Sequence, residues 1–591
     1  MNDAARADSL RLAQPADAHS QAEWEAATAA VLRKSGRLTA DDADSLVWDK
    51  LTRTSLDGLR IAPLGLPDTS IADAARPTRS GAWDIRSLVS GLSGVDAKAA
   101  NEAALVDLDG GVSSLWVAAD ETTDLAVLLD KVLLDLAPIV LDAPIGAVKV
   151  AQNLLALIAE RGAGLHAATN LGADPMGALL RDLPLAPDEA FAELVDLARL
   201  AQGIGVRAIV VDATAAHDLG ASDVQELGWS IAVGVAYLRA LTEAGFSPAV
   251  AASLIEFRFA ATDEQFPTIA KLRAARQLWA RVLELSGAEG VEMRIHAVSS
   301  RPMLSKYDPY VNMLRGTVAA FAAGVGGADA VTVLPFDSAN GVPDGFGRRI
   351  ARNVSHLLID ESHVAAVADP AGGSFAVEQL TADMAAAGWE AFIQIEEEWE
   401  QGRDFSPFRD RIAAVSAERE KAIARRKRPI TGLTEFPNLA ETLPERPVDP
   451  LNERVVRYGA SFEALRDTPA ATKVFLATLG TVAQHTARAT FATNLLAAGG
   501  IGVEVAGATA DAEELTGKYR AAGAPPVACL AGSDKTYAEW GAAAIAALRE
   551  AGATHVIIAG KPDAVDAEVD DAASMGVDAL AFLTATREKL S

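Results

Sequence analysis

Short apolar runs alternate with longer segments of helical apolar spacing between about residues 80 and 425. The apolar runs predict buried strands at 113–118, 139–143, 208–212, 254–260, 293–299 and 330–335. Segments between them, such as 223–241, 262–285 and 308–323, have the spacing of amphipathic helices. This alternation predicts a parallel sheet with helical crossovers, and a chain of about 250 or more residues commonly closes such a sheet into an eight-stranded barrel. We therefore expect an α/β fold with a TIM-type (β/α)8 barrel over residues 61–425.

A second alternating unit begins at Lys473. Five further strands are expected at 474–477, 502–505, 526–530, 555–559 and 578–582, and helices at 486–498, 512–521 and 537–550. Repeated β-α units of this size are typical of a doubly wound domain. We expect a flavodoxin-like domain over residues 471–591.

Two flanking segments differ from these domains. Residues 1–60 hold one amphipathic helix, 21–34, within polar sequence, so this N-terminal arm is expected to dock on the main domain or to wrap a partner. Residues 426–470 include the scattered prolines Pro429, Pro437, Pro444, Pro447 and Pro450 and predict an extended linker. The basic run 425–428 at its start is expected to be a solvated helix end.

Charge and composition exclude several classes of protein. The net charge of −27 argues against a nucleic-acid binder, and an anionic substrate would need a local basic pocket. The most apolar stretch, 125–158, is interrupted by charges every few residues, so no membrane span is expected. The N-terminus has no signal-peptide core, and the single Cys529 excludes an internal disulfide or a cysteine-cluster metal site. No nucleotide-binding loop or His-Glu-x-x-His pair is present, and we expect a soluble cytoplasmic protein.

Several stretches of the first domain resemble the methylmalonyl-CoA mutase family. They are 51–58, 83–86, 269–279, 349–353 and 369–374. The most distinctive is the run Lys-Leu-Arg-Ala-Ala-Arg-x-Leu-Trp from Lys271, which also fits an outer barrel helix with solvated arginines. The resemblance extends from about residue 50 to the end. It implies an acyl-CoA-binding barrel, a linker and a cobalamin-binding-type domain.

The second domain departs from the motif that ligates cobalt in this family. The family carries Asp-x-His-x-x-Gly after the first strand, in which the histidine ligates cobalt and the aspartate orients it. Here Ala483 replaces the aspartate and Arg488 the glycine, and only His485 remains. A lone histidine that opens a helix is expected to be a capping or surface residue.

Three further departures point the same way. The hydroxyl of the family's Ser-x-Leu is lost at Ala528, and the first glycine of its Gly-Gly is replaced by Ala559. The family's Pro-Gly-Thr aligns with the side chains at 582–584. The resemblance thus implies a degenerate cobalamin-binding domain, and we expect no cofactor-binding residue and no metal ligand in this chain.

The barrel motifs are altered as well. Leu88 stands for a tyrosine beside the substrate, and Ala215 for a histidine on the thioester carbonyl. His217, two positions later, is expected to be a structural residue at a strand end. His296 is retained and is the one candidate for a residual polar contact. The segment 257–262 is expected to narrow the tunnel for a pantetheine arm, so no catalytic residue is expected and acyl-CoA binding is doubtful.

Some bacterial members of the family have two different subunits, of which one is catalytic and the other a degenerate copy. The chain resembles the degenerate copy. The resemblance implies a heterodimer with a homologous large subunit that binds adenosylcobalamin and interconverts (R)-methylmalonyl-CoA and succinyl-CoA. Two alternatives stay open: a self-sufficient acyl-CoA mutase with His485 as the cobalt ligand, and a regulatory or chaperone-like protein that binds the mutase transiently.

Overall fold

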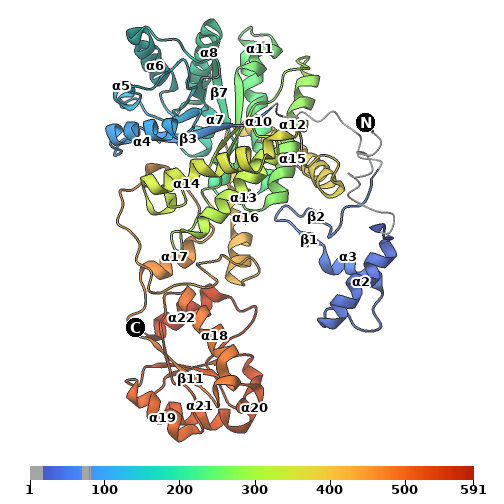
Figure 1. Cartoon of the computed structure of the whole chain (residues 1–591), viewed down its shortest axis with the longest axis vertical. Helices are drawn as coiled ribbons and strands as arrows, with labels where there is room; N and C mark the ends of the chain where they lie inside the picture. The colour runs from blue at the N-terminus through green and yellow to red at the C-terminus, as the bar shows by residue number, and fades with distance from the viewer. Residues whose placement is uncertain (1–16, 69–78, 80, 591) are drawn as a thin grey trace, which may run out of the picture.

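The chain folds into two stacked domains and a small N-terminal arm that projects to one side (Figure 1). The computed structural model describes residues 17–68, 79 and 81–590. Within these residues, no helix is both long and apolar enough to cross a membrane.

The larger domain is a closed barrel of eight parallel strands in the order β10-β3-β4-β5-β6-β7-β8-β9. The strands are β3 Asp84–Ser90, β4 Ser114–Ala118, β5 Ile139–Asp142, β6 Asn170–Ala173, β7 Arg207–Asp212, β8 Ile255–Ala261, β9 Ile295–Ser299 and β10 Ala330–Thr332. The predicted TIM-type barrel is therefore confirmed. Only β3 and β6 lie outside the six predicted runs, because polar residues interrupt β3, and β6 includes an asparagine and a glycine.

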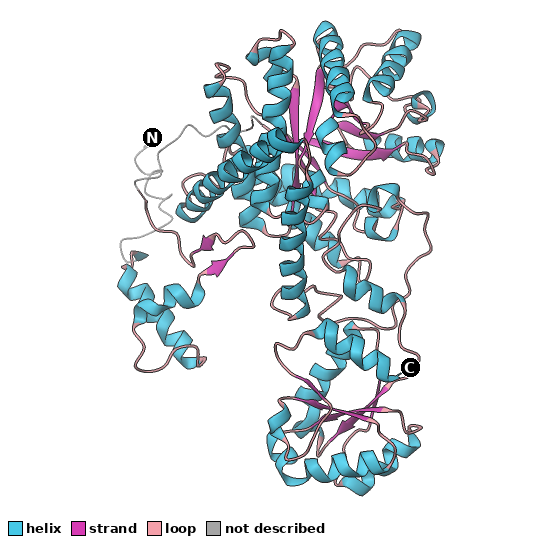
Figure 2. Cartoon of the chain, turned by 180° about the vertical axis from the view of Figure 1, so that it is seen from behind, coloured by secondary structure: helices cyan, strands magenta, loops and turns pink. Residues whose placement is uncertain are grey.

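Helices surround the barrel on its outside (Figures 1 and 2). The main ones are α4 Ala97–Asp109, α6 Ala147–Arg161, α8 Pro187–Ile204, α10 Asp223–Glu243, α12 Gln265–Leu285, α13 Val311–Val325, α14 Gly345–His356, α15 Phe375–Gly402 and α16 Ser406–Ala424. The predicted helix 223–241 coincides with α10 almost residue for residue.

The cationic residues of α12 are buried, so the expectation of solvated arginines was wrong. Lys271 faces α10, Arg273 faces α15, and Arg276 faces the end of the barrel. Their partners are Asp223, Glu378 and Asp329, at 2.8, 3.1 and 2.8 Å respectively. Burying a charge is costly unless it is paired, and here each cation has its carboxylate. The motif thus joins the helix layer to the barrel.

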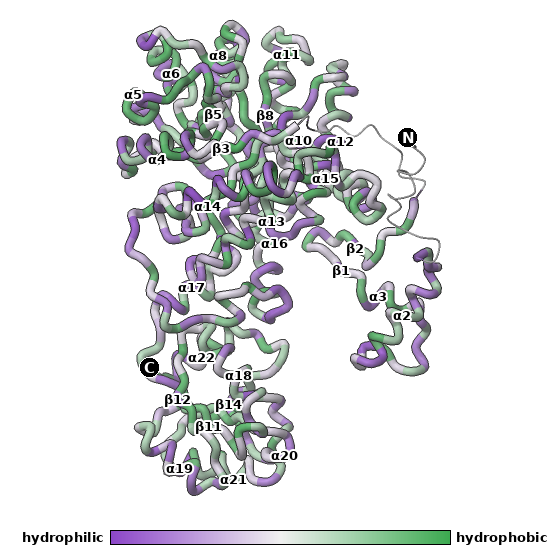
Figure 3. The backbone as a smooth tube through the Cα atoms, viewed as in Figure 1, coloured by the Kyte–Doolittle hydropathy of each residue, from purple (hydrophilic) through white to green (hydrophobic). Residues whose placement is uncertain are grey.

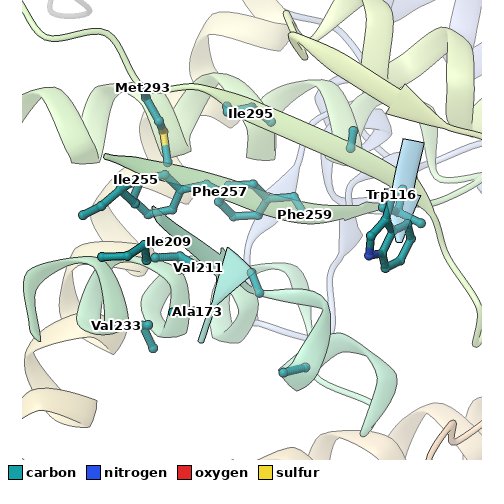
Figure 4. Close-up of a cluster of buried hydrophobic side chains, with 14 of the residues drawn as sticks. Trp116, Ala173, Ile209, Val211, Val233, Ile255, Phe257, Phe259, Met293 and Ile295 are labelled. Carbon is teal, nitrogen blue, oxygen red and sulfur yellow. The ribbon is translucent and has the colours of Figure 1, made fainter. Parts of the chain in front are cut away.

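The side chains of strand β8 alternate between the outside and the inside of the barrel. Phe257 and Phe259 point outward into the helix layer with Ile209, Val211 and Ile295 (Figure 4). Phe257 meets Trp279 of α12 edge to face, with ring centres 4.8 Å apart. Because side chains alternate along a strand, Glu256 and Arg258 point inward. The segment 257–262 was expected to narrow a tunnel; within it Arg258, and not the two aromatic residues, occupies the barrel interior.

The smaller domain has a five-stranded parallel sheet in the order β12-β11-β13-β14-β15, with helices on both faces (Figure 2). Its strands, β11 Val474–Thr478, β12 Val503–Val505, β13 Val527–Ala531, β14 His555–Ala559 and β15 Asp571–Ala573, include the most hydrophobic part of the domain (Figure 3). The helices include α18 Val482–Ala498, α19 Ala512–Ala521, α21 Ala542–Glu550 and α22 Ala579–Leu590. The flavodoxin-like prediction is confirmed in its fold class.

The fifth strand was placed wrongly at 578–582, because β15 precedes that segment and α22 begins within it. The buried residues of α22 are Ala579, Phe582, Leu583, Thr586 and Leu590. This is helical spacing, which a window of five residues does not separate from a buried strand.

The N-terminal arm contains α2 Gln21–Lys34, as predicted, and α3 Val47–Leu51. The two helices enclose a small core of their own, in which Trp24 and Trp48 lie 4.7 Å apart. α2 stands away from the barrel and from the smaller domain (Figures 1 and 2), whereas Trp48 of α3 lines a cavity together with Gln379 and Asp383 of α15. The short hairpin of β1 Arg53–Thr54 and β2 Arg60–Ile61 follows them along the chain.

Candidate functional site

A charged layer crosses the lower half of the barrel interior. Arg86 of β3 is fully buried and pairs with Glu256 of β8 and with Asp84. Its Nε also donates to Ser114 Oγ at 3.0 Å. Burial alone would raise the pKa of Glu256, but the charges of Arg86 and Arg294 together hold that pKa below its usual value. TIM-barrel interiors are usually filled with branched apolar side chains. In this barrel, a layer of ion pairs crosses the axis instead.

A second layer lies above the first, towards the carboxyl ends of the strands. The Arg258 guanidinium lies over the Trp116 ring, 4.2 Å from its centre, and donates to Asp142 at 2.8 Å. Trp116 Nε1 donates to the same carboxylate at 2.8 Å. His296 meets Trp116 edge to face, and its Nε2 is 2.8 Å from the hydroxyl of Thr332.

Burial, followed by the charges of Arg86 and Arg258, lowers the pKa of His296 well below its usual value. The imidazole ring is therefore neutral, and it contacts neighbouring side chains inside the barrel. His296 lines neither the cavity at the barrel mouth nor the cavity beside β3.

The barrel mouth holds a cavity of about 320 Å³ at the ends of β4, β5 and β7. Its charged lining includes Asp142, Arg181, Asp212, Asp218 and Arg301. Burial would raise the pKa of Asp212, but Arg181 and Arg258 outweigh it and hold that pKa at about 2. Burial raises the pKa of Asp218 to about 6. The carboxylates and guanidiniums of this cavity largely neutralise one another.

The segment after residue 446 covers this mouth. Residues 450, 451 and 453–455 line the cavity directly. Val456 N donates to Asp218 O at 2.8 Å, and Tyr458 N to Pro302 O at 2.9 Å. The expected extended linker therefore lies fixed across the barrel, and it also contains a helix, α17 Ala460–Asp467, that the sequence prediction lacked.

The other barrel positions singled out from the sequence lie around the mouth. Ala215 lines the mouth cavity from the short helix α9 Thr214–Asp218. His217, on the same helix, is buried with its Nε2 2.7 Å from Ser300 Oγ. Burial lowers its pKa well below the usual value, so it is a neutral core residue. Leu88 lines a separate cavity beside β3.

His485 lies in the first turns of α18, but it is neither a cap nor a surface residue, contrary to the expectation. The helix is capped by Thr481, whose side chain and that of Gln484 form a capping box. His485 is only 6% exposed, and its Nδ1 has no hydrogen-bond partner. The methyl group of Ala483 offers no acceptor. The ring thus lacks the carboxylate that would orient a metal-binding histidine.

Arg488 and Tyr537 fill the space at the ends of β13 and β14. The Tyr537 hydroxyl lies 3.0 Å from the carbonyl oxygens of both Leu530 and Ala559. The Arg488 guanidinium packs 4.7 Å from the Tyr537 ring centre and donates to Gly532 O at 2.8 Å. The backbone beyond these strand ends is therefore already occupied by side chains of this chain.

Gly560, which follows β14, has a φ of 141° that favours glycine. A Cβ added there would lie 3.4 Å from Arg488, so the space this glycine leaves is taken by the arginine. Ala528 is fully buried within β13. The comparison of 582–584 with Pro-Gly-Thr was wrong in register, because these residues lie inside α22 and the segment after β15 is 574–577. Among the described residues, no group of three or more His, Cys, Asp or Glu is arranged to hold a metal ion.

The residues around His485 and Arg488 in the smaller domain do not fit a corrin with its nucleotide tail. The histidine has no orienting carboxylate, and a bulky arginine replaces the glycine of the motif. Tyr537, which the sequence comparison missed, closes the strand ends from a position that no motif marks.

Comparison with known proteins agrees with this architecture. The family described as methylmalonyl-CoA mutase matches residues 87–522. The chain is 44% identical to the "Methylmalonyl-CoA mutase small subunit" of Streptomyces virginiae, over 99% of this chain and 98% of that protein. It is 36% identical to the protein of the same name from Propionibacterium freudenreichii subsp. shermanii, over 92% and 90% of the two chains. The chain therefore belongs to the methylmalonyl-CoA mutase family.

Proposed function

We propose that the chain is the small, non-catalytic subunit of a heterodimeric, adenosylcobalamin-dependent methylmalonyl-CoA mutase. Its partner is a homologous large subunit that binds the cofactor and interconverts (R)-methylmalonyl-CoA and succinyl-CoA. The observation that carries the proposal is the pair Arg488 and Tyr537, which occupies the strand ends where this family places its cofactor motifs. The relatives named as small subunits support the same assignment.

His485 lacks what cobalt ligation requires of a histidine. A ligating imidazole needs a partner on its other ring nitrogen to fix its tautomer and orientation. His485 Nδ1 is buried without such a partner. Adenosylcobalamin supplies a carbon radical when it is bound, so a chain that does not bind it cannot initiate the rearrangement, and we assign the cofactor to the large subunit.

The barrel supports a non-catalytic role independently. A thioester substrate that followed the barrel axis would have to displace the Arg86–Glu256 pair and the Arg258–Asp142 pair. Removing one partner from a buried ion pair costs about 3–5 kcal/mol, so both layers resist opening. The position of the histidine that contacts the thioester carbonyl is taken by Ala215, which offers no hydrogen bond.

The proposed role is structural. Pairing of homologous chains retains the two-fold contact of an ancestral homodimer, and a permanent interface of this kind buries about 2,000 Å² or more. We assign residues 1–60 to a partner-wrapping arm, because α2 stands away from the rest of this chain (Figure 1). Residues 61–425 form the barrel, 426–470 the linker and 471–591 the degenerate domain, in a complex that we place in the cytoplasm.

The test is co-expression with the large subunit encoded by the same organism. A tag on this chain should retain the large subunit through size exclusion at nanomolar concentration, and mutase activity should require the large subunit. His485→Ala in this chain should leave activity unchanged, whereas the matched histidine-to-alanine change in the large subunit should abolish it. Activity of this chain alone would establish a self-sufficient mutase, and dissociation during size exclusion would establish a transient regulator.

A further inference from the structure

The barrel opens at the seam between its first and last strands. β10 pairs with β3 only at Ala330 beside Asp84 and at Val331 beside Ile85. The rest of β3 has no partner on this side, although it continues to Ser90. A cavity of about 370 Å³ fills the gap, with α4 and α14 among its walls.

The lining of this cavity, which we term the seam cavity, is largely apolar. It includes Leu88, Val89, Ala103, Val333, Leu334 and Ala351. Apolar cavities of about 150 Å³ hold one benzene molecule, so the seam cavity has room for more than twice that bulk. Small-molecule sites typically have 300–1,000 Å³ and an apolar lining with few polar groups. The seam cavity matches that class in volume and in character.

One side of the seam cavity carries an excess positive charge. Arg348 and Arg352 of α14 both line it and share a single carboxylate, Asp107 of α4. Arg352 Nη1 lies 3.0 Å from Asp107 Oδ1, and Ser87 Oγ donates to Oδ2 at 2.7 Å. Two guanidiniums against one carboxylate leave one net positive charge beside an apolar space.

None of the other charged lining residues forms an ion pair with the arginines of α14. Arg86 is paired within the barrel interior, and Arg301 lies 4.0 Å from Asp218. Asp96 caps the N-terminus of α4 at the exposed rim, and Asp449 accepts from Leu451 N at 3.0 Å. Both aspartates are therefore engaged with backbone amides and not with the arginines of α14.

Three buried polar atoms of the lining residues have no partner. They are Ser90 Oγ, Arg348 Nε and Arg352 Nε. These atoms have almost no accessible surface, and Arg352 Nε packs against Gly110, so they do not face the open cavity. An anion in the cavity would instead meet the outer faces of the two guanidiniums and balance their charge.

We propose that the seam cavity binds an amphiphilic monocarboxylate, such as a medium-chain carboxylic acid. The carboxylate lies at Arg348 and Arg352, and the hydrocarbon chain lies along Val89, Ala103 and Leu334. A charge-assisted hydrogen bond to guanidinium is favourable where water is largely excluded. This site goes beyond the proposed function and does not depend on it, because it uses neither a cofactor nor the partner's chemistry.

The experiment measures octanoate binding by calorimetry, with octan-1-ol as the uncharged probe. The protein is the full chain, or its complex with the large subunit. Octanoate should bind at one site per copy of this chain, and octan-1-ol at least about tenfold more weakly, because it lacks the charge. Arg352→Met should weaken octanoate binding by at least about tenfold. That change leaves Arg348 paired one to one with Asp107, so the fold should persist.

Two controls separate the site from a general effect. Arg349→Met changes the exposed arginine beside Arg348 and should not alter binding. Ala103→Leu fills the cavity and should abolish binding, whereas Ala97→Leu on the same helix, outside the lining, should not. The proposal is overturned if octanoate does not bind, which would mean that the cavity holds water only. It is equally overturned if octan-1-ol binds as well, or if Arg352→Met and Ala103→Leu both bind like the unchanged chain.

Discussion

The hydroxyl of Tyr237 on α10 donates to the carboxylate of Asp174 at 2.6 Å, and Met176 N donates back to the same tyrosine oxygen at 2.8 Å. Asp174 also caps the short helix α7 Pro175–Leu180 by accepting from Gly177 N. The pair thus ties the outer helix layer to the end of β6. Burial, with the charge of Asp212 added, raises the pKa of Asp174 to about 7.

This pKa gives stability a specific pH dependence. Between about pH 4 and pH 7 the folded carboxyl keeps its proton while the unfolded one loses it, so stability falls as the pH rises, by up to about 1.4 kcal/mol per pH unit. Asp174→Asn removes this contribution and keeps a capping side chain. The urea midpoint of the variant, relative to the unchanged chain, should therefore rise from pH 5 to pH 7. Parallel midpoints across that range would contradict the assignment.

Arg258 is expected to be the costliest single residue of the barrel interior. Arg258→Met leaves the half-buried Asp142 with only the Trp116 donor and removes a cation from the buried Asp212, so it should destabilise the fold by about 3–5 kcal/mol. The double variant Arg258→Met with Asp142→Asn should recover part of that loss, since the uncompensated charge is gone. Unfolding in urea measures both. If the two changes are simply additive, the pair does not interact as described.

Tyr537→Phe tests whether the tyrosine closes the strand ends of the smaller domain. It removes the donor to the Leu530 and Ala559 carbonyl oxygens and should lower stability by about 1 kcal/mol. The matched change Tyr310→Phe, at a side chain that is 64% exposed, should shift stability by less than about 0.5 kcal/mol. Equal effects of the two changes would show that the Tyr537 hydroxyl makes no stabilising bond.

The segment over the barrel mouth should resist proteases until its anchor is removed. Arg446 donates to Asp337 at 2.6 Å and to Asp344 at 2.8 Å just before that segment. Arg446→Ala should raise the rate of proteolytic cleavage within 447–458 several-fold, because local opening becomes less costly. Mass spectrometry of the fragments measures this, with Arg349→Ala, an exposed arginine outside the segment, as the control. Rapid cleavage of the unchanged chain would show that the segment is a loose linker.

Much of the fold follows from local patterns. Six of the eight barrel strands are apolar runs, and α10 has its capping box in the sequence at Ser222 and Gln225. The inward direction of Arg258 also follows from its alternation with Phe257 and Phe259 along the strand. The prediction of the fifth strand of the small sheet failed, because β15 has only three residues with little apolar character.

The parts of the site that could not be predicted depend on long-range packing. Tyr537 follows β13 by several residues, and only the folded sheet brings it beneath Arg488 of α18. The burial of Arg273 and Arg276 likewise depends on α15 and on the end of the barrel, which supply carboxylates distant in sequence. His485 looked like a surface residue because helical position alone does not state which face is covered.

The most direct test is the cobalt content of the purified complex with the large subunit, saturated with adenosylcobalamin. If this chain cannot hold the corrin, elemental analysis will give one cobalt per heterodimer, and the isolated chain titrated with cobalamin will give no base-off spectrum and retain no corrin after gel filtration. Two cobalt atoms per heterodimer, with the second lost on His485→Ala, would contradict it.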